Sequence, residues 1–72
     1  MNYTYDVLVE RANSLPYSFN FETYKTAHDW ARDYMRKNKT ELNSTTITIM
    51  RFDEEDNYTV MKTGNRKDWI EA

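Results

Sequence analysis

The sequence predicts a small α+β domain with the element order ββαββ, in which a four-stranded antiparallel sheet carries one amphipathic helix on one face. Alternating residues at positions 3–10 and 17–22 have the period of two that is typical of half-buried strands. The period then lengthens to 3.6 over positions 24–37, which indicates a helix. Two further runs, 45–52 and 58–62, are rich in β-branched and aromatic residues and complete the sheet.

The first two strands are expected to pair as an antiparallel hairpin. Apolar or aromatic residues occupy the odd positions of both runs, beginning with Tyr3 and Tyr17. Between the runs, Leu15 and Pro16 supply turn chemistry, because proline restricts its own backbone and that of the residue before it.

The helix is predicted from an apolar stripe and from its ends. Ala27, Trp30, Ala31 and Tyr34 stand at i, i+3, i+4 and i+7, so they share one face. Thr23 is a suitable N-cap, since its hydroxyl can accept a hydrogen bond from a free amide of the first turn, and Asn38 is expected at the other end.

The second half of the chain is predicted to be a second hairpin followed by a tail. Strands 45–52 and 58–62 are joined by a short loop that holds four consecutive acidic residues. The tail, 63–72, contains Trp69 and Ile70, which are apolar enough to be expected to dock on the body. The whole chain, 1–72, is expected to be one domain.

A single helix covers only one face of the sheet, so the other face is predicted to be open unless the tail folds over it. The sequence allows either arrangement. An exposed apolar cluster often marks an interface, so an open face could also be a dimer or partner surface. The helix side is expected to hold Tyr5, Val7, Val9, Phe19, Phe21, Ile47, Ile49 and Val60. The open side is expected to hold Leu8, Met50, Phe52 and Met61.

Composition excludes several classes of function. Twelve acidic against ten basic residues give a net charge of -2, which disfavours a general nucleic-acid binder. There is no cysteine, and a single glycine cannot form a glycine-rich phosphate loop. No apolar run approaches the length of a membrane span and no signal peptide is evident, so we expect a soluble intracellular protein without a membrane contact.

No catalytic, cofactor-binding or metal-binding set emerges from the sequence. The acidic loop lacks the EF-hand pattern, since with Asp53 as the first position the sixth is Tyr58 and the twelfth is Gly64. His28 is expected on the polar side of the helix as a solvated residue, with no serine or cysteine nucleophile spaced to meet it. We therefore expect a non-enzymatic protein that binds no cofactor.

Three surfaces could bind a partner. The acidic loop, Asp53, Glu54, Glu55 and Asp56, is either a solvated hairpin tip or a group of carboxylates for a basic partner. The open sheet face could instead form a homodimer, which would make the chain a structural accessory subunit. Direct nucleic-acid binding is the other alternative, through basic residues at the helix end and in the tail: Arg36, Lys37, Lys39, Arg66 and Lys67.

The stretch "YSFNFETYKTAHDWARDYM", positions 17–35, together with the ββαββ order and the tiny cysteine-free chain, resembles the small early proteins of bacteriophages and mobile elements that take over or inhibit a bacterial host. The resemblance implies stoichiometric binding to a host protein in the bacterial cytoplasm. Some members of that group act as acidic mimics of nucleic acid on nucleic-acid-binding proteins. The strongest mimics are far more acidic than this chain, so the resemblance implies local mimicry by the acidic loop.

Overall fold

A computed structural model describes residues 2–12, 14–37, 45–65 and 67–71. Its elements are strands β1 (Thr4–Arg11) and β2 (Tyr17–Phe21), helix α1 (Tyr24–Lys37), strands β3 (Thr45–Phe52) and β4 (Tyr58–Gly64), and a single π-helical turn, η2 (Lys67–Glu71). The predicted helix end at Asn38 and the link up to position 44 lie outside the described residues.

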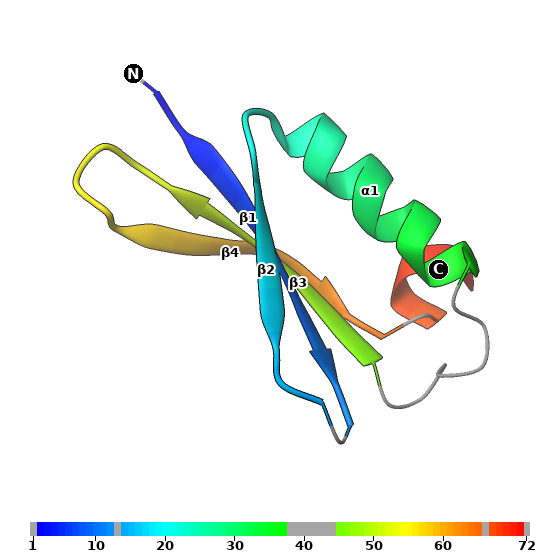
Figure 1. Cartoon of the computed structure of the whole chain (residues 1–72). Coiled ribbons are helices and arrows are strands. Elements are labelled where there is room, and N and C mark those ends of the chain that lie inside the picture. The colour runs from blue at the N-terminus through cyan, green and yellow to red at the C-terminus, as the bar shows by residue number, and fades with distance from the viewer. Residues whose placement is uncertain (1, 13, 38–44, 66, 72) are drawn as a thin grey trace.

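The four strands form one sheet in the order β2-β1-β3-β4, and each neighbouring pair is antiparallel (Figure 1). The predicted α+β class and ββαββ order are confirmed. The hairpin of the first two strands is also present, with Val7 opposite Phe19. The pairing of β1 with β3, which are far apart in the sequence, joins the two hairpins into one open sheet. Strands β2 and β4 are therefore its edges.

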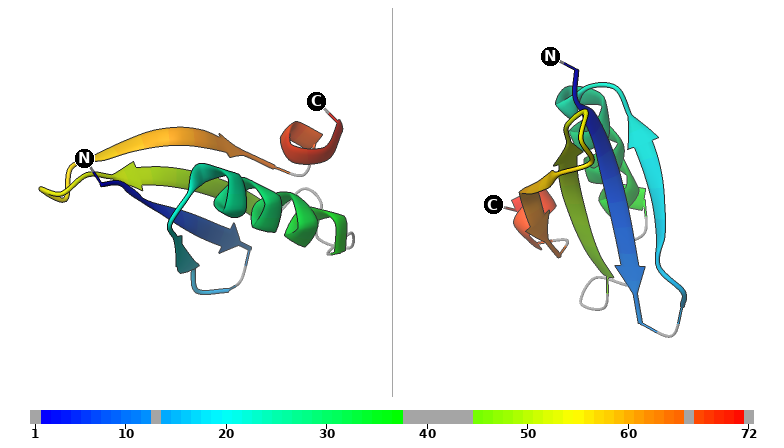
Figure 2. Two further views of the ribbon diagram at one scale, coloured as in Figure 1. Left: turned by 90° about the horizontal axis from the view of Figure 1, so that it is seen from above. Right: turned by 90° about the vertical axis from the view of Figure 1, so that its left-hand side faces the viewer.

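Helix α1 lies across one face of the sheet and leaves the other uncovered (Figure 2). It begins where the sequence predicts, because the Thr23 Oγ1 accepts a hydrogen bond of 3.2 Å from the Thr26 amide. Ala27, Ala31 and Met35, spaced by four residues, are its buried side chains. Two small alanines let the helix approach the central strands closely, and Met35 fills the space at its end.

The core lies between α1 and the two central strands. Val7 and Val9 of β1 and Ile47 and Ile49 of β3 are fully buried. Aromatic rings extend this core toward the β2 edge, where Trp30 lies 4.9 Å from the Phe19 ring. These rings are only partly buried, and Phe19 is 44% exposed, so they flank the aliphatic core without filling it.

The tail docks beside α1 and does not cover the open face. Trp69 is 4% exposed, and its Nε1–H donates a 3.3 Å hydrogen bond to the Ile47 carbonyl. The turn is capped reciprocally, because Asp68 Oδ2 accepts from the Asn65 amide and Asn65 Oδ1 accepts from the Lys67 amide. The arrangement in which the tail folds over the open face is therefore wrong for the described residues.

A β-bulge in β4 changes which side chains reach the open face. Ile49 pairs with Lys62 whereas Met50 pairs with Val60, so Met61 is an extra residue in the strand. Residues directly opposite in neighbouring strands share a face. Val60 therefore lies with Met50 on the open side, and its expected place on the helix side was wrong.

Candidate functional site

The sheet face opposite α1 is left uncovered by the described elements. Pairing places Phe52 opposite Tyr58 and Met50 opposite Val60, while Leu8 lies across from Thr48 on the neighbouring strand. Of these apolar side chains, Tyr58 is 63% exposed and Val60 is 50% exposed. We call Leu8, Met50, Phe52, Tyr58 and Val60 the open-face patch.

The open-face patch includes three of the four residues predicted for it from the sequence. Leu8, Met50 and Phe52 lie there, each only partly buried. The fourth, Met61, is the bulge residue and is 40% exposed. Sequence reasoning missed Tyr58, whose ring lies 5.9 Å from that of Phe52, and Val60, which the bulge turns outward.

Charge is sorted between the two faces of the sheet. On the open face the charged strand residues are Asp6 and Glu10, both acidic. On the helix side the charged strand residues are all basic: Arg11, Arg51 and Lys62. The strands thus hold an acidic and partly apolar surface back to back with a basic one.

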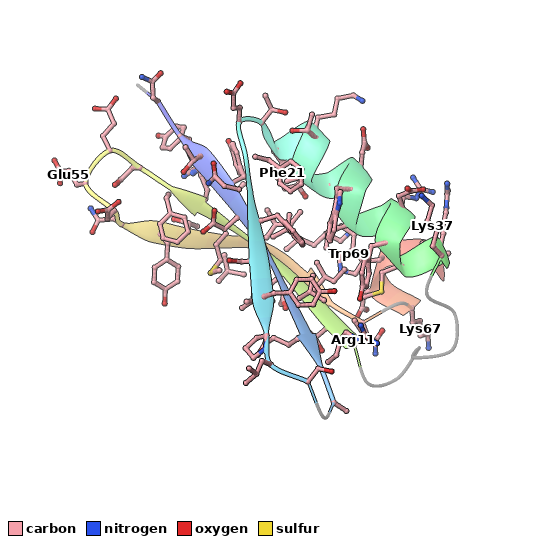
Figure 3. All side chains as sticks on the ribbon, viewed as in Figure 1. Arg11, Phe21, Lys37, Glu55, Lys67 and Trp69 are labelled. Atoms are coloured by element: carbon pink, nitrogen blue, oxygen red, sulfur yellow. The ribbon has the colours of Figure 1, made fainter. Side chains whose placement is uncertain are left out.

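The acidic loop extends from the same sheet between β3 and β4, at the opposite end of the molecule from η2 (Figure 3). Asp53 organises this loop. Its Oδ1 accepts hydrogen bonds from the amides of Glu55 at 2.8 Å and Asn57 at 3.0 Å. These backbone hydrogen bonds to the carboxylate hold the pKa of Asp53 below its ordinary value.

The other three loop carboxylates are exposed, and their positions are fixed by the turn. The Asp56 amide donates to the Asp53 carbonyl at 3.2 Å, and Asp56 has a φ of 64°, in the left-handed region that Asp and Asn tolerate. Glu54 Oε1 accepts from the Asn2 amide at 3.1 Å. The loop is therefore an ordered hairpin tip that displays Glu54, Glu55 and Asp56 and uses Asp53 to build itself.

The predicted basic residues come together only in part. Arg36 and Lys37 end α1, and Lys67 begins η2, which packs against α1. Figure 3 shows Lys37 and Lys67 at the same end of the molecule. Lys39 and Arg66 lie outside the described residues.

His28 is not the solvated residue that the sequence predicts. It is partly buried, and its ring lies 5.0 Å from that of Trp69 and 5.7 Å from that of Tyr24. Burial first, and then the nearby charge of Lys62, lower the pKa of His28; Arg32 acts in the same direction and Asp29 opposes them. The expectation failed because it ignored where the tail would dock.

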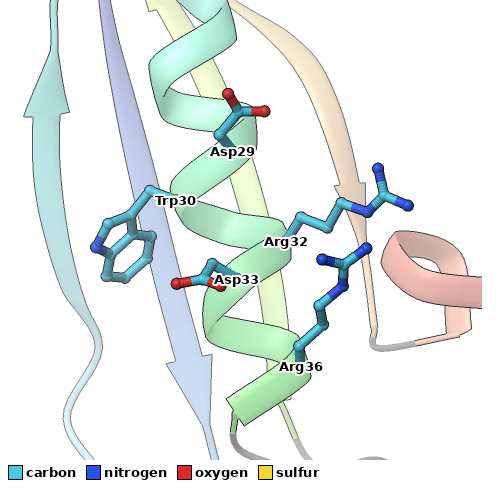
Figure 4. Close-up of a pocket in the computed structure, with 5 residues that line it drawn as sticks. All are labelled: Asp29, Trp30, Arg32, Asp33 and Arg36. Atoms are coloured by element: carbon cyan, nitrogen blue, oxygen red, sulfur yellow. The ribbon is translucent and has the colours of Figure 1, made fainter.

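A shallow depression on the outer surface of α1 is lined by Asp29, Trp30, Arg32, Asp33 and Arg36 (Figure 4). Both of its carboxylates are held by lysines of the same helix, Asp29 by Lys25 at 3.0 Å and Asp33 by Lys37 at 2.9 Å.

Within the described ranges, no three His, Cys, Asp or Glu side chains gather in a way that could hold a metal ion. No described helix is long and apolar enough to cross a membrane. The chain matches no protein family, no curated protein and no solved structure.

Proposed function

We propose that this chain is a non-enzymatic binding protein that uses the open-face patch and the acidic loop to bind a basic surface of another protein. One observation carries the proposal: on a single side of the sheet, uncovered apolar side chains occur together with charges that are all acidic. Protein interfaces commonly combine an apolar centre with a polar rim. Here Met50 and Val60 would supply the centre, and the carboxylates the rim.

The carboxylates have two roles in this proposal. Complementary charge speeds the encounter with a basic partner and orients it. Glu54, Glu55 and Asp56, held by the Asp53 turn, then occupy positions where a basic partner would otherwise bind phosphates. Together with the sequence resemblance, this supports inhibition of a bacterial nucleic-acid-binding protein in the host cytoplasm by occupancy of its binding surface.

A homodimer through the same face is less well supported. A two-fold dimer brings identical patches together, so Asp6 and Glu10 of one copy would meet the acidic surface of the other. Like charges across an interface oppose association. A basic partner meets no such opposition.

The test requires variants that remove charge without disturbing the loop. Glu54→Gln, Glu55→Gln and Asp56→Asn together remove three charges, while Asp53 keeps its two amide contacts and Asn is tolerated at the positive φ of position 56. The matched control, Glu22→Gln, Asp29→Asn and Asp33→Asn, makes the same change in net charge at residues outside the acidic loop and the open-face patch. Val60→Lys tests the patch by placing a cation at its centre.

The immobilised wild-type chain and each variant are incubated with a bacterial lysate, and a captured basic protein is purified for affinity measurements. We expect the wild type and the control to bind it equally. The loop variant should lose at least about tenfold in affinity at low salt, and Val60→Lys should lose binding as well. Equal affinity of the loop variant and the control, or affinity that does not fall with added salt, would contradict the proposal.

A further inference from the structure

The helix side of the molecule carries a second charged surface that the proposed function does not use. His28, Arg32 and Arg36 stand at i, i+4 and i+8 on α1, so they form one row with neighbours roughly 6 Å apart. Lys67 begins η2, which packs both against α1 and against β4, the strand that carries Lys62. We call Arg32, Arg36, Lys62 and Lys67 the cationic cluster; His28, whose pKa is lowered, lies beside it as a neutral ring.

Trp69 holds the cluster together. The buried Trp69 ring lies 5.0 Å from the ring of His28, which belongs to α1. The Nζ of Lys62, which belongs to β4, lies 4.4 Å from the centroid of the same Trp69 ring. The ring thus fixes a helix residue and a strand residue beside each other. Because Trp69 is anchored to Ile47 by a hydrogen bond, this arrangement belongs to the folded core.

The cations of the cluster lack carboxylate partners in the part of the chain that the structure describes. The ion pairs there join Lys25 to Asp29 and Lys37 to Asp33. In Figure 4, Arg32 and Arg36 extend from one side of α1 whereas Asp33 extends from another. Asp68, the acidic residue of the first turn of η2, already accepts the Asn65 amide.

Helix stability explains only a small part of this pattern. Cations in the last turn of a helix complement its dipole, which accounts for Arg36. His28 and Arg32 lie further back along the helix, and Lys62 and Lys67 lie outside it. The mutual proximity of these cations is unfavourable for the free protein. Burial is the main cause of the lowered pKa of His28; the charges of Lys62 and Arg32 act in the same direction and Asp29 opposes them.

We propose that the cationic cluster binds the phosphodiester backbone of a nucleic-acid strand. Clustered cations of this kind are neutralised by an anion, and a row of them along a helix suits a ligand with several regularly spaced negative charges. The overall charge of -2 does not oppose this locally. The acidic strand residues lie on the other face of the sheet, and the helix carboxylates Asp29 and Asp33 are paired with Lys25 and Lys37. The binding should be weak and strongly dependent on salt.

The experiment measures fluorescence anisotropy of a labelled 20-nucleotide single-stranded DNA, and of the same RNA sequence, with the full chain at low salt. The test variant is Arg32→Gln with Arg36→Gln. The matched control is Lys25→Gln with Arg51→Gln, which removes two cations outside the cluster, one paired with Asp29 and one stacked on Tyr3. Circular dichroism verifies that both variants remain folded.

We expect the test variant to lose about tenfold in affinity and the control to lose less than about twofold. The slope of log affinity against log salt should fall by about 0.7 for each lost phosphate contact, and so by about 1.4 in the test variant. The loop variant, Glu54→Gln with Glu55→Gln and Asp56→Asn, should bind the oligonucleotides at least as well as the wild type. That result would separate this surface from the one in the proposed function.

Three outcomes would overturn the inference. The first is no binding of either oligonucleotide at low salt with protein at about 100 μM. The second is an equal loss in the test and control variants, which would indicate only a general charge effect. The third is binding of heparin, but not of the oligonucleotides, which would indicate a different polyanion.

Discussion

The two faces of the sheet are built by the same strands yet differ in packing and in charge. Ile49 and Met50 are neighbours in β3, but Ile49 is fully buried under α1 whereas Met50 lies in the uncovered patch. Arg51, one residue on, shares the helix side with the other basic strand residues. The alternation of a strand thus lets one short segment contribute to the core, to the open-face patch and to the basic side of the sheet.

Stability should depend on the buried residues of the helix side, and the proposed binding on the exposed residues of the open side. The helix side supplies nearly all of the buried core, and the open side supplies exposed apolar area that adds little to folding. A chain this small rarely has more than about 3 to 5 kcal/mol of stability. Changes to the buried core residues on the helix side should therefore unfold the protein, and changes to the exposed residues of the open-face patch should leave it folded.

The largest expected effect is that of Trp69→Ala. Removing a buried tryptophan costs about 3 to 5 kcal/mol, which equals the whole stability expected of the domain, and the Ile47 carbonyl loses its donor. We expect no cooperative thermal transition by circular dichroism. Trp69→Phe, which keeps most of the packing, should retain a transition at lower temperature; a native-like melting curve for Trp69→Ala would show that the tail is not part of the core.

The next prediction compares the two neighbours directly. Ile49→Ala should cost about 2 to 5 kcal/mol because it leaves a cavity in the core. Met50→Ala should cost less than about 1 kcal/mol, since its side chain is only partly buried. Urea denaturation of both variants measures the difference, and equal costs would mean that the open face is covered in solution.

A smaller effect is expected from Gly64→Ala at the junction of β4 and the tail. A Cβ at this position would lie 2.5 Å from the Asp68 Cβ, so the η2 turn must shift. Overpacking of this kind costs about 1 to 3 kcal/mol. Tryptophan fluorescence should move to longer wavelength as Trp69 becomes more exposed, and Thr63→Ala, a change at the neighbouring exposed residue, serves as the control.

The local elements could be predicted from the sequence, but their three-dimensional relations could not. The period of 3.6 and the Thr23 cap gave the helix limits, 24–37, that the structure shows, and strand 45–52 agrees as well. These signals are local, since they depend on residues a few positions apart. They therefore identify an element without identifying its neighbours.

The open face shows what local signals leave out. Val60 reaches it only because a bulge at Met61 shifts the pairing with β3, and nothing within β4 itself specifies that shift. The surroundings of His28 depend in the same way on the docking of Trp69, forty-one positions later in the chain. The sequence correctly predicted that the acidic loop connects a hairpin. It did not show that Asp53 organises the loop while the other three carboxylates are exposed, because that difference is visible only in the hydrogen bonds that Asp53 accepts.

The smallest expected effect is a dependence of stability on pH that arises from His28 on the helix side of the molecule. The pKa of His28 is lowered in the folded protein by burial and by Lys62, so the unfolded chain binds a proton more readily. Stability should then fall as pH decreases through about 6.5, the ordinary histidine pKa, and the loss should be complete below the lower folded value. His28 is the only histidine in the sequence, so melting temperatures between pH 7.5 and 5.5 report mainly this group. The melting temperature of His28→Gln should depend less steeply on pH in that range. The groups that face the His28 ring are Trp69, Lys62, Arg32 and Asp29. An equally steep decrease in the variant would assign the pH dependence to groups other than His28.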